Sequence, residues 1–254
     1  MKHGLALSGG AMRGFAHAGV LSVLERAGYK PDIVAGTSAG AVIGALYIRG
    51  FKPKELILLA SRFTFLKVMR FDMPFDGLSN SKGVKKVLEP YLGGVEFSDL
   101  EIPLLVATTD LKTGKPVILE KGLVIDALAA SVAVPGFINP VKYGKYLLID
   151  GAFSNPLPIK PLKDHNVERV IAVDLNHLPP QIGASNMINT VARSTDIMMT
   201  NLIKAQSMQA DVLIKVPTYA YDPLSDKNVK QLYLVGARAA RRKLVNIKKL
   251  INKK

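Results

Sequence analysis

The chain has 254 residues, of which 48% are hydrophobic, and its formal net charge is +14. This length suits one large domain or two small ones, and the apolar fraction suffices for a substantial core. The absence of cysteine excludes disulfides and thiolate metal sites, and it is consistent with a cytoplasmic protein. Residues 1–8 are too short for the apolar region of a signal peptide, so none is expected. The uncharged run 33–48 is shorter than the roughly 20 residues of a membrane-spanning helix.

Predicted strands and helices alternate along the chain. Apolar runs predict strands at residues 4–7, 33–35, 104–109, 116–120, 146–149, 169–173 and 212–216. Helical spacing and capping residues predict helices at residues 15–27, 39–49, 53–61, 81–91, 123–131, 189–208 and 226–254. The alternation indicates an α/β protein with three layers, in which helices flank a mostly parallel central sheet. We expect residues 1–254 to form one domain, with its chemistry at the carboxyl ends of the strands.

A G-x-S-x-G motif, Gly36-Thr37-Ser38-Ala39-Gly40, lies between a predicted strand and a predicted helix. Glycines at both ends allow a tight turn and a close approach to neighbouring elements. The following helix directs its free N–H groups and its positive end toward the turn. Serine is a weak nucleophile and needs a base within hydrogen-bonding reach. The motif predicts that Ser38 is a nucleophile, although an ordinary strand-to-helix turn can have the same pattern.

Two kinds of base are compatible with Ser38. Asp150 ends a predicted strand and is followed by the small residues Gly151 and Ala152, so a carboxylate is one candidate. A triad would require a histidine, and the order Ser…Asp…His is met by only two of the four histidines. The better placed of these is His177, in the loop after the strand at residues 169–173.

A glycine-rich loop, residues 8–14 (SGGAMRG), follows the first predicted strand and opens a helix. Its amides can converge on one point and stabilise an oxyanion, and Arg13 can hold the loop or add positive potential. Dinucleotide binding is the rival interpretation, but Ala11 stands where the G-x-G-x-x-G pattern needs glycine. A P-loop is excluded because no G-K-[S/T] sequence follows.

In combination, these segments resemble the patatin-like phospholipase family. The resemblance covers residues 4–174, about two thirds of the chain, and includes the blocks 8–21, 36–40, 109–114, 130–140 and 150–158. It implies a Ser38–Asp150 dyad without a catalytic histidine, metal or cofactor. It further implies an oxyanion hole from the amides of Gly9, Gly10 and Ala11. Arg13 fills the family's basic position, whereas Ala11 departs from the third glycine that the family often has.

The resemblance predicts a serine lipid acyl hydrolase of the phospholipase A, lysophospholipase or esterase type, acting through an acyl-enzyme on a fatty-acyl ester. A thioesterase or acyltransferase with the same dyad, and a non-catalytic lipid-binding module, are the alternatives. The irregular apolar segment 63–80 is expected to be either a lid over the acyl site or a packed loop.

The C-terminal segment 227–254 contains ten Lys or Arg residues and no acidic residue. It predicts either a solvated helix face or peripheral contact with an anionic membrane surface. Nucleic acid is not an expected partner, because the run lacks interleaved aromatic residues and a recognised binding motif. The sequence does not predict an oligomeric state.

Overall fold

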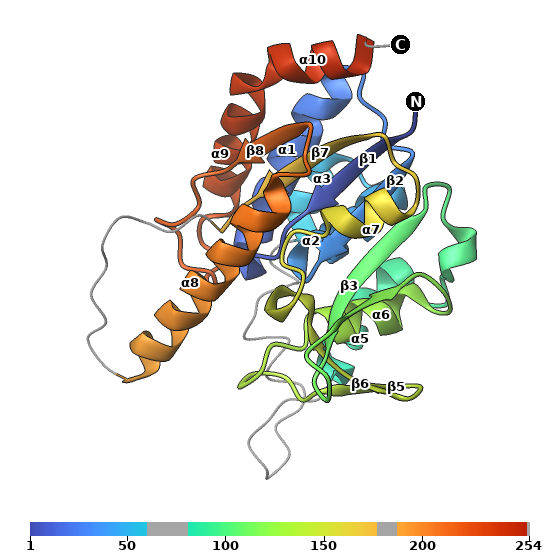
Figure 1. The fold of residues 1–254 in the computed structure, drawn as a ribbon, viewed down its shortest axis with the longest axis vertical. Coiled ribbons are helices and arrows are strands. Elements are labelled where there is room, and N and C mark those ends of the chain that lie inside the picture. Colours follow the sequence, from blue (N-terminus) through green and yellow to red (C-terminus); the bar gives the residue numbers. More distant parts are fainter. Residues whose placement is uncertain (60–80, 177–186, 253–254) are drawn as a thin grey trace.

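The computed structural model describes residues 1–59, 81–176 and 187–252 of the chain (Figure 1). Its centre is an eight-stranded sheet with the order β5-β6-β3-β2-β1-β7-β8, in which β4 also pairs with β3. The strands are β1 (His3–Leu7), β2 (Ile33–Thr37), β3 (Leu104–Asp110), β4 (Pro116–Leu119), β5 (Val141–Tyr143), β6 (Tyr146–Asp150), β7 (Arg169–Asp174) and β8 (Val212–Lys215). The segment 63–80, expected to be either a lid or a packed loop, lies outside the described residues.

The helices lie between these strands. They are α1 (Phe15–Arg26), α2 (Ala39–Ile48), α3 (Pro53–Leu59), α5 (Lys82–Leu92), α6 (Val124–Ser131), α7 (Ile159–Asp164), α8 (Met187–Ser207), α9 (Val229–Arg242) and α10 (Leu244–Asn252). Short 3₁₀ turns occur at η1 (Ala11–Gly14), η2 (Phe97–Asp99) and η3 (Gly151–Phe153). The sequence did not predict α7 or β5. A three-residue strand and a six-residue helix that contains Pro161 leave too weak a pattern to recognise.

The sheet is mostly parallel, as expected. Strands β3, β2, β1, β7 and β8 run parallel, whereas β4 and β6 are antiparallel to β3. All five residues of β2 and all seven of β3 are buried, as expected for strands covered on both faces. The prediction of a flanked α/β sheet is therefore confirmed. The sheet is not wholly parallel at the site, because Asp150 is the last residue of the antiparallel strand β6.

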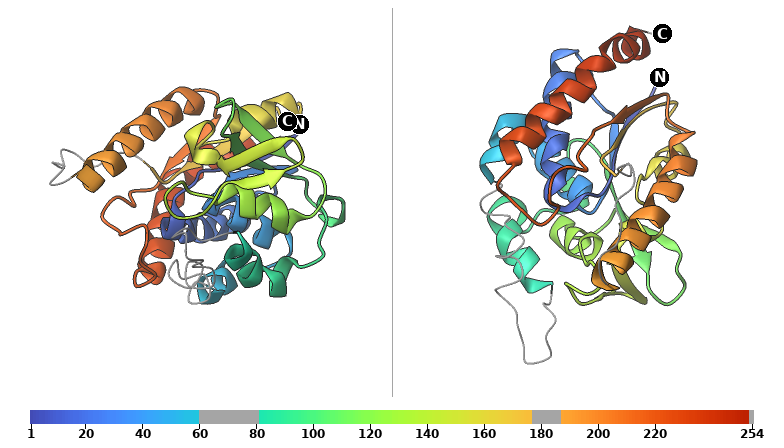
Figure 2. Two further views of the ribbon diagram at one scale, coloured as in Figure 1. Left: turned by 90° about the horizontal axis from the view of Figure 1, so that it is seen from below. Right: turned by 90° about the vertical axis from the view of Figure 1, so that its left-hand side faces the viewer.

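Two apolar layers cover the sheet, and Figure 2 shows α8 on the opposite side from α1 and α9. One layer packs Leu5 and Leu7 of β1 against α1, α2 and α9, and the other packs Ala6 against α7 and α8. This division follows from the alternation of side chains along a strand. The three-layer arrangement leaves the carboxyl ends of the parallel strands free to carry the site.

The C-terminal basic segment differs from the single helix that was expected, because α9 ends at Arg242 and α10 begins at Leu244. Gly236 of α9 crosses α1 beside Gly19, where a Cβ on Gly236 would overlap the carbonyl oxygen of Ala16. The basic side chains of both helices point away from this contact and are exposed. The apolar faces thus anchor the two helices while their charges face solvent.

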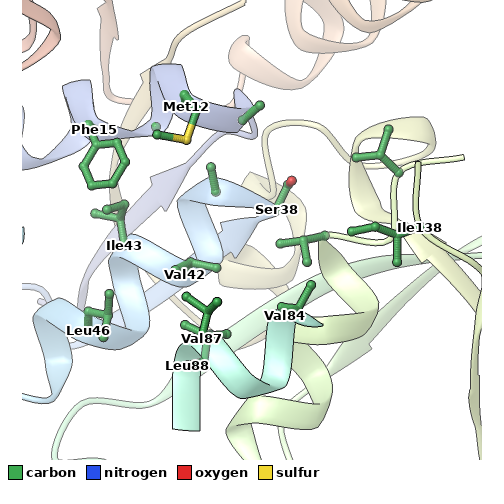
Figure 3. A pocket seen from close by; sticks show the side chains of 15 residues that line it. Met12, Phe15, Ser38, Val42, Ile43, Leu46, Val84, Val87, Leu88 and Ile138 are labelled. Atoms are coloured by element: carbon green, nitrogen blue, oxygen red, sulfur yellow. The ribbon is translucent and has the colours of Figure 1, made fainter. Parts of the chain in front are cut away.

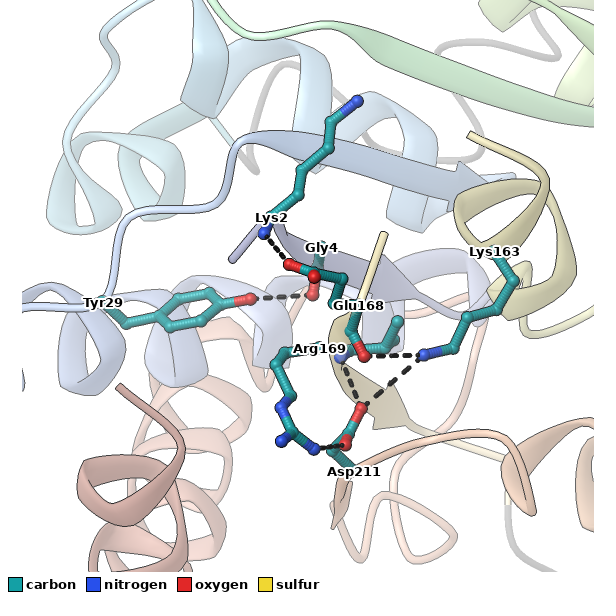
Figure 4. Close-up of polar contacts among 8 residues, drawn as sticks. Lys2, Gly4, Tyr29, Lys163, Glu168, Arg169 and Asp211 are labelled. Carbon is teal, nitrogen blue, oxygen red and sulfur yellow. Dashed lines mark hydrogen bonds and ion pairs between the residues drawn. The ribbon is translucent and has the colours of Figure 1, made fainter. Parts of the chain in front are cut away.

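Polar contacts join strand ends at the amino edge of the sheet, opposite the site (Figure 4). The Tyr29 hydroxyl donates to the carbonyl oxygen of Gly4 at 2.7 Å. Asp211 accepts from Arg169 at 2.9 Å and from the Val170 amide at 2.8 Å, which ties the start of β8 to β7. These contacts can account for the stability of this edge without any catalytic role.

Candidate active site

Ser38 lies in a strained turn between β2 and α2. Its φ of 52° and ψ of −123° are unusual for a residue with a β-carbon, and the residue is only 6% exposed. A Cβ on Gly36 would overlap the backbone of Ala41, and one on Gly40 would overlap the carbonyl oxygens of Leu7 and Ser8. The two glycines of the motif are therefore required for close packing, and the turn presents Ser38 at the carboxyl end of β2.

The backbone of this turn is held by side chains from distant segments. The Ser38 amide donates to Ser131 Oγ at 2.8 Å, and Ser131 Oγ donates to the Ala107 carbonyl at 2.7 Å. Thr37 Oγ1 donates to the Asn155 carbonyl at 2.7 Å. In the sequence, Ser131 is one residue of the family block 130–140. Its contacts connect α6, β3 and the turn, a role that sequence spacing alone does not reveal.

Asp150 is the buried carboxylate of the site. Its Oδ1 accepts the Ala152 amide at 2.8 Å, and Gly151 packs directly on the Ala107 carbonyl. Burial raises the pKa of Asp150 to about 6, while hydrogen bonding with the Ser38 side chain and the Ala152 amide opposes the rise. Near neutral pH, the carboxylate beside Ser38 is ionised and able to accept a proton.

The described histidines are placed for structural contacts. His17 is fully buried and donates from Nε2 to the Ser8 carbonyl at 2.8 Å, and burial lowers its pKa to about 4. Its Nδ1 has no hydrogen-bond partner among the described residues. His165 contacts Glu120 and the Pro161 carbonyl, and the His3 ring lies against Tyr29. The triad candidate, His177, lies outside the described residues.

The glycine-rich loop lies against Ser38. A Cβ on Gly9 would stand 3.4 Å from Ser38 Cβ. The Gly9 amide donates to the Pro156 carbonyl at 3.3 Å, so it is already engaged. The amides of Gly10 and Ala11 have no acceptor within the described part of the chain. Of the three candidate oxyanion amides, these two N–H groups are therefore the ones left without a partner in the described part of the chain.

Ala11 has a φ of 48°, in the left-handed region that favours glycine. Alanine can occupy this region at a cost of roughly 1–2 kcal/mol. The substitution for the family's third glycine thus leaves the N–H in place. It also adds a methyl group to the wall of the neighbouring cavity.

Arg13 connects the loop to the segment after β8. Its Nε donates to the Tyr221 carbonyl at 2.8 Å, and the neighbouring Met12 amide donates to the Pro223 carbonyl at 2.9 Å. Partial burial lowers the pKa of Arg13, against the opposing charges of Asp196 and Asp222. Of the two roles considered for Arg13, these contacts favour holding the loop in shape.

An apolar cavity opens beside Ser38 (Figure 3). Met12 and Phe15 line one side, α2 lines the base, and α5 closes the other side with Val84 and Leu88. In Figure 3, Leu46 and Ile138 lie on opposite sides of Ser38 along this surface. Ser38 and Leu46 are about 12 Å apart along a helix, given a rise of 1.5 Å per residue. Ser38 carries the only polar side chain among the described lining residues, so the cavity can accept a hydrocarbon chain.

The described residues form neither a metal-binding cluster nor a membrane-spanning helix. No group of three or more histidine and carboxylate side chains there could hold a metal ion. None of the helices found in residues 1–59, 81–176 and 187–252 has the length and apolar character needed to cross a bilayer.

The chain is therefore an α/β protein that carries a serine turn beside a buried carboxylate and an apolar cavity. Residues 5–163 match the profile of the patatin-like phospholipase family, and the chain belongs to this family. The resemblance found in the sequence motifs is thereby confirmed.

Two relatives in sequence are consistent with this family assignment, and one solved structure shares the fold. An uncharacterized NTE family protein of Mycobacterium bovis is 35% identical over 175 residues, which cover 68% of this chain and 48% of the relative. Lysophospholipase NTE1 of Candida albicans is 30% identical over 68% of this chain and 13% of its own length. The chain thus spans half or less of the length of these relatives. The crystal structure of VipD from Legionella pneumophila shares the fold, with a TM-score of 0.57, 13% identity, and coverage of 96% of this chain and 66% of VipD.

Proposed function

We propose that this protein is a serine lipid acyl hydrolase that cleaves fatty-acyl esters through a Ser38–Asp150 dyad. The observation that carries the proposal is the position of Ser38. It stands at the edge of an otherwise apolar cavity and beside a buried carboxylate whose pKa is raised to about 6. A nucleophile, a base and a hydrocarbon site therefore meet at one point. The name of the C. albicans relative, a lysophospholipase, supports a lipid substrate.

The proposed reaction proceeds in two halves. Ser38 Oγ adds to the ester carbonyl carbon, its proton moves to Asp150, and the carbonyl electron pair becomes an oxyanion. The amides of Gly10 and Ala11 donate to that oxyanion. When the carbonyl re-forms, the C–O bond to the alcohol breaks, and Asp150 returns the proton to the leaving alcohol. The acyl group is then bound to Ser38.

Water completes the cycle. Asp150 accepts a proton from water as the water oxygen adds to the acyl carbon. Collapse of the second tetrahedral species breaks the bond to Ser38, and the proton on Asp150 returns to Ser38 Oγ. A carboxylate suits an apolar site as base, because proton transfer leaves a neutral acid.

The same residues can serve a thioesterase or an acyltransferase, since both reactions form an acyl-serine. Parallel assays with a thioester, a glycerolipid and a lysolipid of one chain length distinguish these activities. Acyl transfer is detected by adding an acceptor alcohol and measuring a new ester against free fatty acid. A catalytically inactive lipid-binding module would bind these lipids but release no product.

The exposed basic face of α9 and α10 supports contact with an anionic lipid surface. We expect the double substitution Arg241→Gln/Lys248→Gln to weaken binding to anionic vesicles at low salt. The matched control, Lys52→Gln/Lys54→Gln, also removes two exposed positive charges, just before and within the first turn of α3. Equal binding by both variants would refute a specific contribution from α9 and α10.

The central test is covalent labelling of the folded protein with a fluorophosphonate, followed by mass spectrometry. We expect an adduct on Ser38, no adduct in Ser38→Ala, and release of fatty acid from ester substrates. A folded protein that forms no adduct and releases no fatty acid would refute the proposed function.

A further inference from the structure

Two successive peptide groups in the glycine-rich loop are held in different ways. The peptide between Ser8 and Gly9 is engaged on both sides: its carbonyl accepts from His17 Nε2 at 2.8 Å, and its N–H donates to the Pro156 carbonyl at 3.3 Å. This peptide therefore has a fixed plane and no free donor. The Ser8–Gly9 peptide therefore anchors the loop to α1 and to Pro156.

The next peptide, between Gly9 and Gly10, is engaged on its carbonyl side only. Asn176 Nδ2 donates to the Gly9 carbonyl at 2.7 Å, and Ser8 Oγ approaches the same oxygen at 3.1 Å. The Gly10 N–H has no acceptor among the described residues. In a planar trans peptide, the C=O and N–H bonds point in opposite directions. A donor that fixes the Gly9 carbonyl therefore also fixes the direction of the Gly10 N–H.

Asn176 is itself held firmly enough to perform this task. The backbone N–H of Asn176 donates to Oδ1 of the buried Asp174, the last residue of β7, at 2.8 Å. The Asn176 carbonyl accepts from Thr200 Oγ1 of α8 at 3.0 Å. The side-chain amide thus projects from a backbone that is fixed by a strand end on one side and a helix on the other.

We propose that Asn176 is a positioning residue that orients the Gly10 amide toward the oxyanion formed at Ser38. The inference rests on the proposed function. Asn176 lies beyond residues 5–163, the part of the chain that matches the family profile. Its hydrogen bond also polarises the Gly9–Gly10 peptide, which strengthens Gly10 N–H as a donor. Because the oxyanion exists only in the tetrahedral state, this contribution acts on kcat rather than on substrate binding.

The test compares wild type, Asn176→Asp and Asn176→Leu with the control Thr195→Val. The Asp variant keeps the shape of the side chain but replaces the donor with an acceptor. The control removes an exposed hydrogen bond within α8, from Thr195 Oγ1 to the Val191 carbonyl, and leaves the contacts of Asn176 intact. Each full-length protein is assayed with a soluble short-chain nitrophenyl ester. An alkyl boronic acid, which forms a tetrahedral adduct with serine, and the fatty acid of equal chain length are compared as inhibitors.

We expect both Asn176 variants to lower kcat by about 10- to 100-fold, somewhat less than loss of an entire oxyanion donor. The affinity for the boronic acid should fall by a similar factor. KM and the affinity for the fatty acid should stay within about twofold of wild type. Thr195→Val should remain close to wild type in kcat and in boronic-acid affinity. If Asn176→Leu fails to fold, the isosteric variant Asn176→Asp still gives the comparison.

Three results would contradict the inference. One is wild-type kcat and boronic-acid affinity in Asn176→Asp. Another is a parallel loss of fatty-acid and boronic-acid affinity, which would indicate only a damaged cavity. The third is an equal loss of kcat in Thr195→Val, which would indicate a general loss of stability in α8. A wild-type protein without esterase activity or labelling at Ser38 would instead refute the proposed function, and with it this inference.

Discussion

Asp150 lies opposite Thr108 in the antiparallel pair of β6 and β3, one residue beyond the point where Thr37 pairs with Ala107. Strand β3 continues past the end of β2, and β6 returns along this extension. The carboxylate at the end of β6 therefore meets the serine that follows β2. Ser38 and Asp150 thus follow strands that run in opposite directions on either side of β3, and β3 contributes neither residue.

Replacement of the carboxylate should abolish turnover. In Asp150→Asn, the side chain retains an oxygen for the Ala152 amide but cannot accept the proton of Ser38, so kcat should fall by about a thousandfold or more. In wild type, kcat/KM should rise as pH increases through about 6, because the base is active when ionised. A pH profile with a soluble ester measures both. Retained turnover in Asp150→Asn would contradict the dyad.

The same substitution should stabilise the fold above neutral pH. Because burial raises the pKa of Asp150 from 3.8 to about 6, the folded state binds more protons than the unfolded state between these values. Stability from this group is therefore present below the unfolded pKa and lost as pH rises through about 6. The loss is about 3 kcal/mol for a two-unit shift. Urea unfolding should show Asp150→Asn more stable than wild type at pH 7.5, with a smaller difference at pH 4.5.

Removal of His177 should leave most of the activity. The proposed mechanism assigns the proton to Asp150, so His177→Ala should keep kcat within a few-fold of wild type. Asp150→Asn, measured in the same assay, is the comparison. A collapse of kcat in His177→Ala to the level of Asp150→Asn would favour a triad over a dyad.

The length of the apolar cavity should limit the acyl chain. Leu46 lines the cavity about 12 Å from Ser38, so Leu46→Trp should fill its far end. We expect kcat/KM for long-chain nitrophenyl esters to fall by tenfold or more, with short-chain esters little changed. Leu234→Trp on the exposed side of α9 is the control. An unchanged chain-length profile in Leu46→Trp would show that the acyl chain binds elsewhere.

Ala11→Gly should be tolerated although it lies in the candidate oxyanion loop. Glycine relieves the cost of a φ of 48°, which offsets its greater freedom in the unfolded chain. The unfolding free energy should stay level or rise by up to about 1.5 kcal/mol, with turnover retained. In the control Ala18→Gly, in the middle of α1, the free energy of unfolding should fall by about 1 kcal/mol or more. A destabilisation of Ala11→Gly equal to that of Ala18→Gly would refute the argument from backbone strain.

Local features of the site could be predicted from sequence because their causes are local. Gly36 and Gly40 permit the turn that presents Ser38, and the apolar spacing of neighbouring segments predicts the strand and helix around it. The same logic predicted the glycine-rich loop and the mostly parallel sheet. It was less successful near Asp150, because the direction of β6 depends on its pairing with β3 and not on its own residues.

The sequence by itself determined the family, the α/β class and the residues proposed for chemistry, since these follow from short motifs and from the periodicity of apolar side chains. Only the tertiary structure decided that the Gly9 amide is engaged and that Ser131, Asn176 and Tyr221 hold the site. These contacts join segments far apart in the chain, and each depends on distances of about 3 Å between groups whose spacing in the sequence carries no signal. Hydrogen bonds of this kind form only after the sheet has brought its strand ends together, so they are properties of the packed fold.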